Sequence, residues 1–223
     1  MISWPATAES LEREQERLAA LAPDPWSPRD GPLRIGACVV VFERGGADET
    51  GWAAAVLLEG SAIVDVATVI GRIEAPFRAG QQALREGPIL ESAVRRLHHA
   101  ADALLVAAAG RDHPRRAGLA LQLGAVLDLP SVGVTERALL ASGGQPARAR
   151  GSLAPLRVGL EVAAYRVRTC AGAGPVVAHA GWRTTAERAA QLVLRTTPAG
   201  RWPEPLRAAR RIARELRDER LPP

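Results

Sequence analysis

Residues 104–135 read LLVAAAGRDHPRRAGLALQLGAVLDLPSVGVT, and this stretch decides the fold. An apolar run over 104–109 is followed by a polar cluster at 111–116, a helical stretch over 117–127 and a second apolar run at 132–134. Strand, loop, helix and strand in this order form the βαβ unit of a parallel sheet. In such sheets, functional sites lie where loops leave the carboxyl ends of the strands. We therefore expect the polar cluster to lie at a functional site.

The composition indicates a globular chain. Its 223 residues, 47% of them hydrophobic, suffice to bury a sizeable core, and we expect residues 1–223 to form a single domain. The sequence has no apolar run of membrane-spanning length, no signal-peptide pattern and only two cysteines, too few for a disulfide framework. It therefore predicts a cytoplasmic protein without a membrane partner, in which Cys38 is a small core residue.

The charge allows a nucleic-acid partner without demonstrating one. All 29 basic residues are arginine, the net charge is +5 and the isoelectric point is near 10.6. From Arg195 onward there are eight arginines against four acidic residues. Two interpretations of this segment stay open: a solvated helix face, or a patch that faces phosphates.

The remaining elements follow from periodicity and from helix breakers. Amphipathic spacing predicts a helix over 11–21, and three apolar runs at 33–43, 52–58 and 62–72 predict an antiparallel meander. Gly87-Pro88 predicts the start of a helix that extends to about residue 99, since proline suits the first turn.

The C-terminal third predicts two strands and two helices. The strands are expected over 156–168 and 175–178, and the helices over 184–194 and 206–220. Meander, helix, strand, helix, strand is the order of the ribonuclease H-like fold. We therefore expect an α/β architecture with a mixed sheet of five or six strands, an antiparallel meander joined to parallel strands, flanked by helices.

Five segments also carry a resemblance to a known family. They are IGACVVVFERGG (35–46), PFRAGQQALREGP (76–88), HPRRAGLALQLGAVLDLPSVGV (113–134), AGWRTT (180–185) and RWPEPLRAA (201–209). In this order they resemble the motifs of endonuclease V, a family of nucleases that nick DNA or RNA near deaminated adenine, or inosine.

The resemblance implies a site built around a divalent metal, Mg²⁺ or Mn²⁺, held by carboxylates. The family's first-strand Asp falls on Val39, its helix Glu on Glu86 and its second-strand Asp on Ala107. The Lys of its G-V-A-K segment falls on Glu136, and the His of its G-H-R-V-S segment falls on Trp182. One carboxylate cannot hold Mg²⁺, which prefers several oxygen ligands. We therefore expect no metal cofactor and no metal-dependent cleavage.

The motifs that face nucleic acid in the family are better kept. Pro and Phe stand where the family has a Pro-Tyr wedge beside the damaged base, and Phe keeps a stacking face without the hydroxyl. The residues that the resemblance assigns to nucleic-acid binding are Pro76, Phe77, Gly80, His113, Arg115 and Arg116. For the HPRR segment, a second interpretation stays open: a turn whose arginines pair with nearby carboxylates.

Three functional hypotheses follow. The first is an endonuclease V-like protein, without nuclease activity, that retains binding of DNA or RNA with deaminated bases or has a regulatory role. The second is a fold reused for another reaction or for protein partnership, with Trp182 and 107–109 lining an apolar pocket. The third is an active inosine-directed endonuclease with relocated ligands, Asp112 and Glu136. Against the third, Asp112 is expected to cap the helix or pair with the neighbouring arginines, and Glu136 to be exposed.

Overall fold

The computed structural model describes residues 4–43, 50–76 and 78–220. It contains thirteen elements in these described ranges: α1 (Ala8–Ala19), β1 (Arg34–Phe42), β2 (Thr50–Glu59), β3 (Ala62–Arg72), α2 (Gln82–Arg95), β4 (Ala103–Val106), α3 (Leu119–Leu127), β5 (Ser131–Thr135), β6 (Leu153–Val158), β7 (Glu161–Val167), β8 (Val176–Ala180), α4 (Ala186–Arg195) and α5 (Glu204–Arg220).

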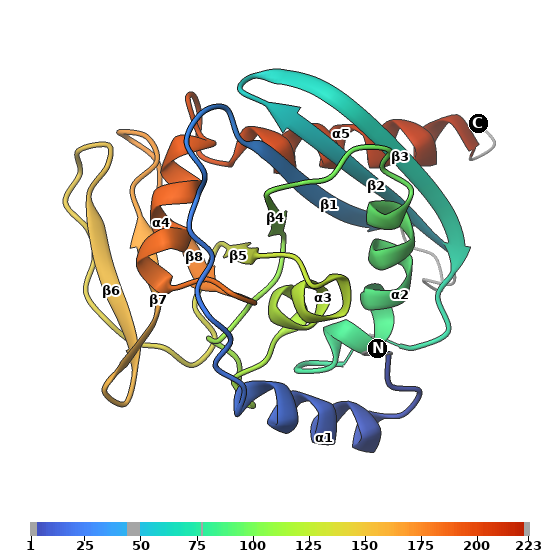
Figure 1. Cartoon of the computed structure of the whole chain (residues 1–223), viewed down its shortest axis with the longest axis horizontal. Coiled ribbons are helices and arrows are strands. Elements are labelled where there is room, and N and C mark those ends of the chain that lie inside the picture. The colour runs from blue at the N-terminus through green and yellow to red at the C-terminus, as the bar shows by residue number, and fades with distance from the viewer. Residues whose placement is uncertain (1–3, 44–49, 77, 221–223) are drawn as a thin grey trace.

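One sheet runs through the molecule, with helices on both sides (Figure 1). Its strand order is β3-β2-β1-β4-β5-β8-β7-β6. The first three strands pair antiparallel, β1, β4 and β5 pair parallel, and β5, β8, β7 and β6 pair antiparallel. The meander and the β4–α3–β5 unit predicted from sequence are thus confirmed. The expected five or six strands were too few, because the described residues form a sheet of eight.

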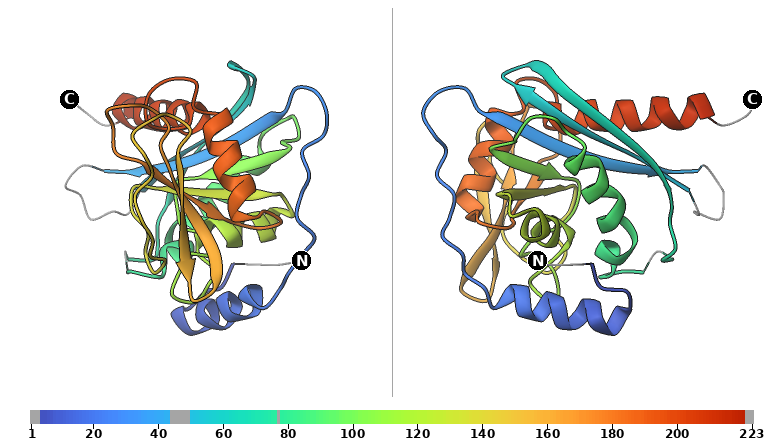
Figure 2. Two further views of the ribbon diagram at one scale, coloured as in Figure 1. Left: turned by 90° about the vertical axis from the view of Figure 1, so that its left-hand side faces the viewer. Right: turned by 45° about the vertical axis from the view of Figure 1, so that its right-hand side comes forward.

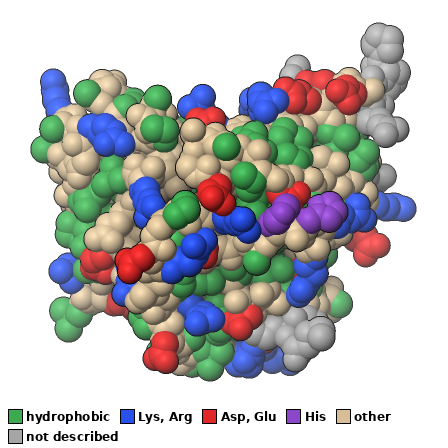
Figure 3. All heavy atoms as spheres, turned by 45° about the horizontal axis from the view of Figure 1, so that its top comes forward, with side chains coloured by type: hydrophobic (Ala, Val, Ile, Leu, Met, Phe, Trp, Pro, Cys, Tyr) green, Lys and Arg blue, Asp and Glu red, His purple; other side chains and the backbone are tan. Residues whose placement is uncertain are grey.

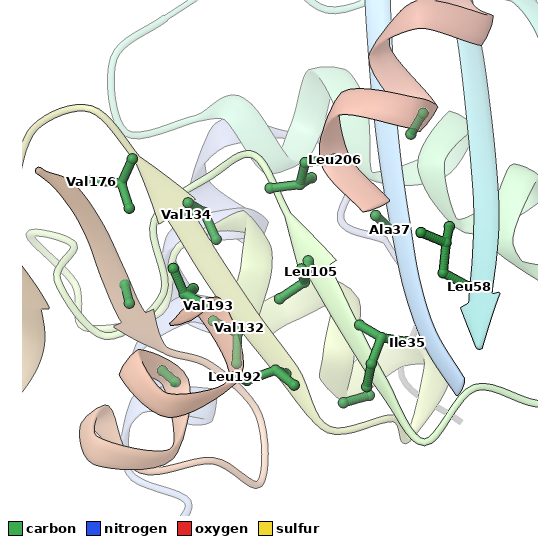
Figure 4. Packing of buried hydrophobic residues seen from close by; sticks show 14 of the residues in the cluster. Ile35, Ala37, Leu58, Leu105, Val132, Val134, Val176, Leu192, Val193 and Leu206 are labelled. Carbon is green, nitrogen blue, oxygen red and sulfur yellow. The ribbon is translucent and has the colours of Figure 1, made fainter. Parts of the chain in front are cut away.

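The two faces of β1 are buried by different helices, which is why this strand is apolar throughout. Odd-numbered residues such as Ile35 pack with α4 and α5, and Figure 4 shows this layer around Leu105, Val132 and Leu206. Cys38 faces the other layer, formed by α2 and α3. Cys38 is buried there, which confirms its role as a small core residue. Views from two further directions show the helices on opposite sides of the sheet (Figure 2).

The predicted start of α2 was wrong. The helix begins at Gln82, so Pro88 lies inside it rather than in its first turn. Ala83, Gly87 and Leu90 form one buried stripe that starts before the proline, whereas Pro88 itself is exposed. Burial of that stripe outweighs the loss of one backbone hydrogen bond, for which interior proline typically costs about 3 kcal/mol.

The stretch 156–168 is two strands rather than one. β6 and β7 form an antiparallel hairpin that turns at Gly159, whose φ of 59° lies in the left-handed region that glycine favours. In addition, β4 ends at Val106, so that 107–109 belongs to the loop rather than to the strand. Each error arose where a short apolar run continued across a turn.

The basic C-terminal segment is mostly a mixed, solvated helix face. Arg211 pairs with Glu215 at 2.9 Å, and Arg207 pairs with Glu204 at 2.9 Å, both on the surface of α5. On the face drawn in Figure 3, basic and acidic side chains are interspersed rather than gathered into a single stripe. No helix in the described ranges is long and apolar enough to cross a membrane.

Candidate functional site

A cavity of about 260 Å³ opens beside the carboxyl ends of β4 and β5. It is lined by residues from α1, from the loop before α2, from the first turns of α2 and α3, from the end of β5, and from the loops that follow β4 and β5: Gln15, Arg78, Ala79, Gly80, Gln82, Ala83, Ala107, Ala108, Ala109, His113, Gly118, Leu119, Thr135, Arg137 and Leu139. This is the edge of the sheet at which the sequence predicts a functional site.

The wall of the cavity is formed by 107–109, which crosses closely over β5. A Cβ added at Gly133 would lie 2.3 Å from the carbonyl oxygen of Ala108, so only glycine fits there. The amide of Ala120 donates to the carbonyl oxygen of Ala109 at 3.0 Å, which fixes this loop to the start of α3. The wall is therefore rigid and apolar.

His113 lies at the base of the cavity and is buried. Its Nδ1 accepts from the amide of Arg115 at 3.2 Å, so that Nε2 carries the proton and donates to the Gly80 backbone. Burial lowers the pKa of His113. Gly80 has a φ of 77°, which places it in the left-handed region. The imidazole is thus a neutral group that holds the loop before α2.

The two arginines of the HPRR segment pair with carboxylates, as one of the two interpretations from sequence predicted. Arg115 contacts Glu12 of α1, and Arg116 contacts Glu161 of β7 at 2.6 Å. Arg116 also donates to the carbonyl oxygen of Arg111 at 2.6 Å. These contacts order the loop that carries His113, and they leave both guanidinium groups neutralised.

Within the described part of the chain, two other arginines at the cavity have unpaired guanidinium groups. Arg78 and Arg137 are exposed and line it, and within the described ranges neither side chain has a hydrogen bond or ion pair. Gln15 of α1 adds a polar group from inside: its Nε2 donates to the Gly80 carbonyl at 3.3 Å, and its buried Oε1 has no partner among the described residues. The cavity therefore offers cations at its rim and an acceptor within.

The expected metal positions do not fit a divalent metal. Val39 is 5% exposed, and Ala107 packs against the same apolar cluster. Glu86 is half-buried and accepts from Gln82 Nε2 at 3.0 Å, and burial raises its pKa to about 7. No group of three or more His, Cys, Asp or Glu side chains in the described part of the chain could share a metal ion. Two aliphatic side chains and one half-protonated acid leave Mg²⁺ too few oxygen ligands.

The two remaining family positions lie elsewhere. Glu136 is exposed and pairs with Arg201 at 3.0 Å, which confirms the expectation of exposure. Trp182 packs with Leu18 and Leu121, and its Nε1 donates to Asp128 at 3.2 Å. The prediction that Trp182 lines an apolar pocket with residues 107–109 was wrong. Trp182 follows β8, which is antiparallel to β5, so it lies near the amino end of β5, whereas the cavity lies at the carboxyl end.

Asp112 neither caps a helix nor pairs with Arg115 or Arg116, so that prediction was wrong. Its fully buried carboxylate accepts from the amides of residues 139–141 at 2.8, 2.7 and 2.6 Å. The loop after β5 folds back over it, a long-range contact that local sequence does not indicate. Pro76 is exposed at a separate groove beside α2, and Phe77 lies outside the described residues.

Sequence reasoning missed Gln15, Arg78, Thr135 and Arg137 as cavity residues. One signal was available for the first of these. Leu11, Gln15 and Leu18 lie on one buried face of α1, so a polar side chain interrupts an otherwise apolar stripe. Arg78 and Arg137 lie on loops with no pattern of their own, and Thr135 is the last residue of β5.

Comparison with known proteins identifies relatives over nearly the whole chain. A family model described as Endonuclease V matches residues 26–211. An endonuclease V of Streptomyces coelicolor is 36% identical over 220 residues, which cover 96% of this chain and 93% of that protein. The solved endonuclease V of Streptomyces avermitilis has a TM-score of 0.87 and 32% identity, over 97% of this chain and 96% of that one.

A more distant structure includes nucleic acid. An endonuclease V of Ciona intestinalis, solved with a 24-mer DNA that contains an inosine followed by a ribo-adenosine, has a TM-score of 0.79 and 19% identity over 95% of this chain and 98% of that one. At this identity the likeness supports the fold alone. Together these structures confirm the ribonuclease H-like α/β fold.

Proposed function

Since the chain belongs to the endonuclease V family, we propose that it binds DNA or RNA at a deaminated base without cutting it by metal-dependent chemistry. In this role it is a reader of inosine-containing nucleic acid or a regulator of other proteins that act there. A cytoplasmic location is part of the proposal. It agrees with the two free cysteines, because a reducing compartment keeps thiols from forming disulfides.

The observation that carries the binding proposal is the cavity beside the ends of β4 and β5. At about 260 Å³ it suits one flat ring system, since pockets for drug-sized ligands have roughly 300–1,000 Å³. Proteins that read an extruded base do so with hydrogen bonds to its edge and apolar contacts to its faces. Gln15 Oε1 supplies an acceptor and 107–109 an apolar wall.

The rim of the cavity supports the choice of a nucleic acid over a neutral ligand. Arg78 and Arg137 have no acidic partner within the described ranges, so their charge is available to phosphates on either side of a bound base. By contrast, Arg115 and Arg116 are neutralised by Glu12 and Glu161. We therefore assign phosphate contact to the first pair and loop order to the second.

Loss of cleavage is supported by the chemistry of the former metal positions. Val39 and Ala107 offer no donor atom, and Glu86 alone retains a carboxyl group. The hypothesis of relocated ligands is not favoured, because Asp112 is occupied by three backbone amides and Glu136 by Arg201. The protein is thus proposed to be a pseudoenzyme with respect to the family's reaction.

Incubation with inosine-containing DNA and RNA in Mg²⁺ or Mn²⁺ tests the absence of cleavage. We expect no nicking above that of the Glu86→Ala variant purified in parallel. Specific nicking by the wild type that disappears in Glu86→Ala would contradict the proposal.

Fluorescence anisotropy with labelled oligonucleotides tests binding. We expect tighter binding of inosine-containing strands than of matched adenine-containing strands, and a steep dependence on salt. Each of the changes Arg78→Ala and Arg137→Ala should reduce the salt slope by about one. Arg195→Ala, at the end of α4 on the other face of the sheet, is the matched control. Equal binding of both strands, with no effect of either cavity variant, would overturn the assignment.

A further inference from the structure

Three polar side chains from distant parts of the chain meet beside the cavity. Thr135 Oγ1 lies 2.7 Å from Nε2 of His179, and Nδ1 of the same ring lies 3.5 Å from Oδ2 of Asp112. Asp112 and His179 have no exposed surface, whereas Thr135 lines the cavity. A hydroxyl on one nitrogen and a carboxylate on the other is the order found in nucleophilic hydrolases.

Electrostatics decide which nitrogen of His179 carries the proton. The Thr135 hydroxyl has one proton and two acceptors, His179 Nε2 and the Arg137 carbonyl oxygen, each at 2.7 Å. With the ring proton on Nε2, the lone pair of Nδ1 would face the Asp112 carboxylate. With the ring proton on Nδ1, the N–H points at the Asp112 carboxylate, and the lone pair of Nε2 can accept the Thr135 hydroxyl proton. The triad requires the second arrangement, which leaves Nε2 as a base next to the hydroxyl. In that arrangement the Thr135 hydroxyl gives up its hydrogen bond to the Arg137 carbonyl oxygen, and the Nδ1 proton, which has no hydrogen-bond partner within the described ranges, is held by the charge of Asp112 at 3.5 Å.

The surroundings keep the imidazole neutral and in place. Burial lowers the pKa of His179, so the ring is uncharged at neutral pH and able to accept a proton. The strand neighbours of His179, Gly133 on β5 and Ala164 on β7, carry no charge. Asp112 is held by three backbone amides, so its carboxylate cannot turn away.

The hydroxyl faces a space suited to a small apolar ester. The alanine wall at 107–109 and Leu119 line the same cavity as Thr135. Arg137 lines it too, and its guanidinium is unpaired among the residues that the structure describes. A cation at this place can stabilise the negative charge that develops on a carbonyl oxygen under attack.

We propose that Thr135, His179 and Asp112 form a nucleophilic triad that hydrolyses small carboxylic esters bound in the cavity. Thr135 and His179 are the catalytic residues, and Asp112 is a positioning residue. The proposal does not rest on the proposed function, because it requires neither nucleic acid nor Glu86.

The reaction is acyl transfer in two steps. Thr135 Oγ1 attacks the ester carbonyl carbon while His179 Nε2 takes the hydroxyl proton; the bond to the leaving alcohol then breaks, and the alcohol takes that proton. The acyl group is now an ester of Thr135. Water attacks it with His179 again accepting a proton, the carboxylic acid leaves, and the proton returns to Thr135.

The first test is labelling with a fluorophosphonate probe, which forms an O–P bond to an activated hydroxyl with loss of fluoride, followed by peptide mass mapping. We expect an adduct on Thr135 that is absent in Thr135→Val and formed at least about a hundredfold more slowly in His179→Phe, as for loss of a general base. Thr196→Val is the matched control, because its half-buried hydroxyl donates to a helix carbonyl and contacts no imidazole. It should label like the wild type.

Hydrolysis of p-nitrophenyl butyrate gives the second readout. We expect turnover by the wild type, none above background by Thr135→Val, and retention of activity by Thr135→Ser, which keeps the hydroxyl. If His179→Phe does not fold, the comparison of Thr135→Ser with Thr135→Val still decides the matter. Absence of a Thr135 adduct, or an adduct formed at the same rate in His179→Phe, would overturn the proposal.

Asp112→Asn tests the positioning role through the pH profile of labelling. Asp112 is the charged group that acts on His179 within the described ranges, and its charge favours the protonated ring. Removal of that charge should move the acidic limb of the profile to lower pH. A variant that labels less at every pH, with an unmoved acidic limb, would show that Asp112 only supports the fold.

Discussion

Glu86 should make the folded protein less stable as the pH rises, and replacing it by glutamine should remove that dependence. The side chain is half-buried, accepts one hydrogen bond from Gln82 and has a pKa raised to about 7. Below the unfolded pKa of about 4.3 the carboxyl group is protonated in both states. As the pH rises toward 7, the unfolded chain releases this proton while the folded chain retains it, so folding is penalised.

The magnitude follows from the shift. A change from 4.5 to about 7 corresponds to about 3 kcal/mol when complete, and the remaining solvent contact of the side chain reduces this to about 2 kcal/mol. Glu86→Gln keeps the shape and the hydrogen-bonding capacity of a neutral acid. It should therefore match the wild type near pH 4 and exceed it in stability by about 2 kcal/mol at pH 8.

Urea unfolding of both proteins at several pH values between 4 and 8 measures this difference, because the other ionisable groups contribute equally to the two proteins. Parallel stability profiles for the two proteins would refute the reasoning. Mg²⁺ provides a second check at pH 8. Because a carboxylate that binds metal would be stabilised in its ionised form, stabilisation of the wild type alone by Mg²⁺ would mean that a metal site exists at Glu86.

Two further predictions concern the loops around the sheet. Gly133→Ala should lower the free energy of unfolding, measured by urea titration, by at least about 2 kcal/mol, because its Cβ would lie 2.3 Å from the Ala108 carbonyl oxygen. Gly144→Ala is the control: there is open space around this residue, so the same titration should show little change in stability. For Asp65, burial acts to raise the pKa, but hydrogen bonds from residues 98–99 lower it to about 2. The contribution of Asp65 to the free energy of unfolding is therefore present above about pH 4 and lost as the pH falls toward 2. Asp65→Asn should lack this loss in acid unfolding, and identical acid profiles of the two proteins would contradict the assignment.

Local sequence determined most elements, because periodicity reports which faces are buried. The apolar runs over β1 and β3 predicted strands with bounds within a residue or two of the observed ones. The motif in 104–135 placed the βαβ unit correctly, and a cavity lies at the carboxyl edge where the motif predicts a site. Prediction failed where a turn interrupts an apolar run, as at Gly159, since a single glycine carries little signal against the strands on either side.

The sequence by itself also determined the absence of acids at Val39 and Ala107, because residue identity needs no structure. Only the tertiary structure decided which polar groups surround the cavity. Thr135 and His179 are 44 residues apart and meet because β5 and β8 pair antiparallel, while Asp112 reaches them because the loop after β5 folds over its carboxylate. Such contacts depend on strand register and on hydrogen bonds between distant segments, and neither leaves a periodic trace in the chain.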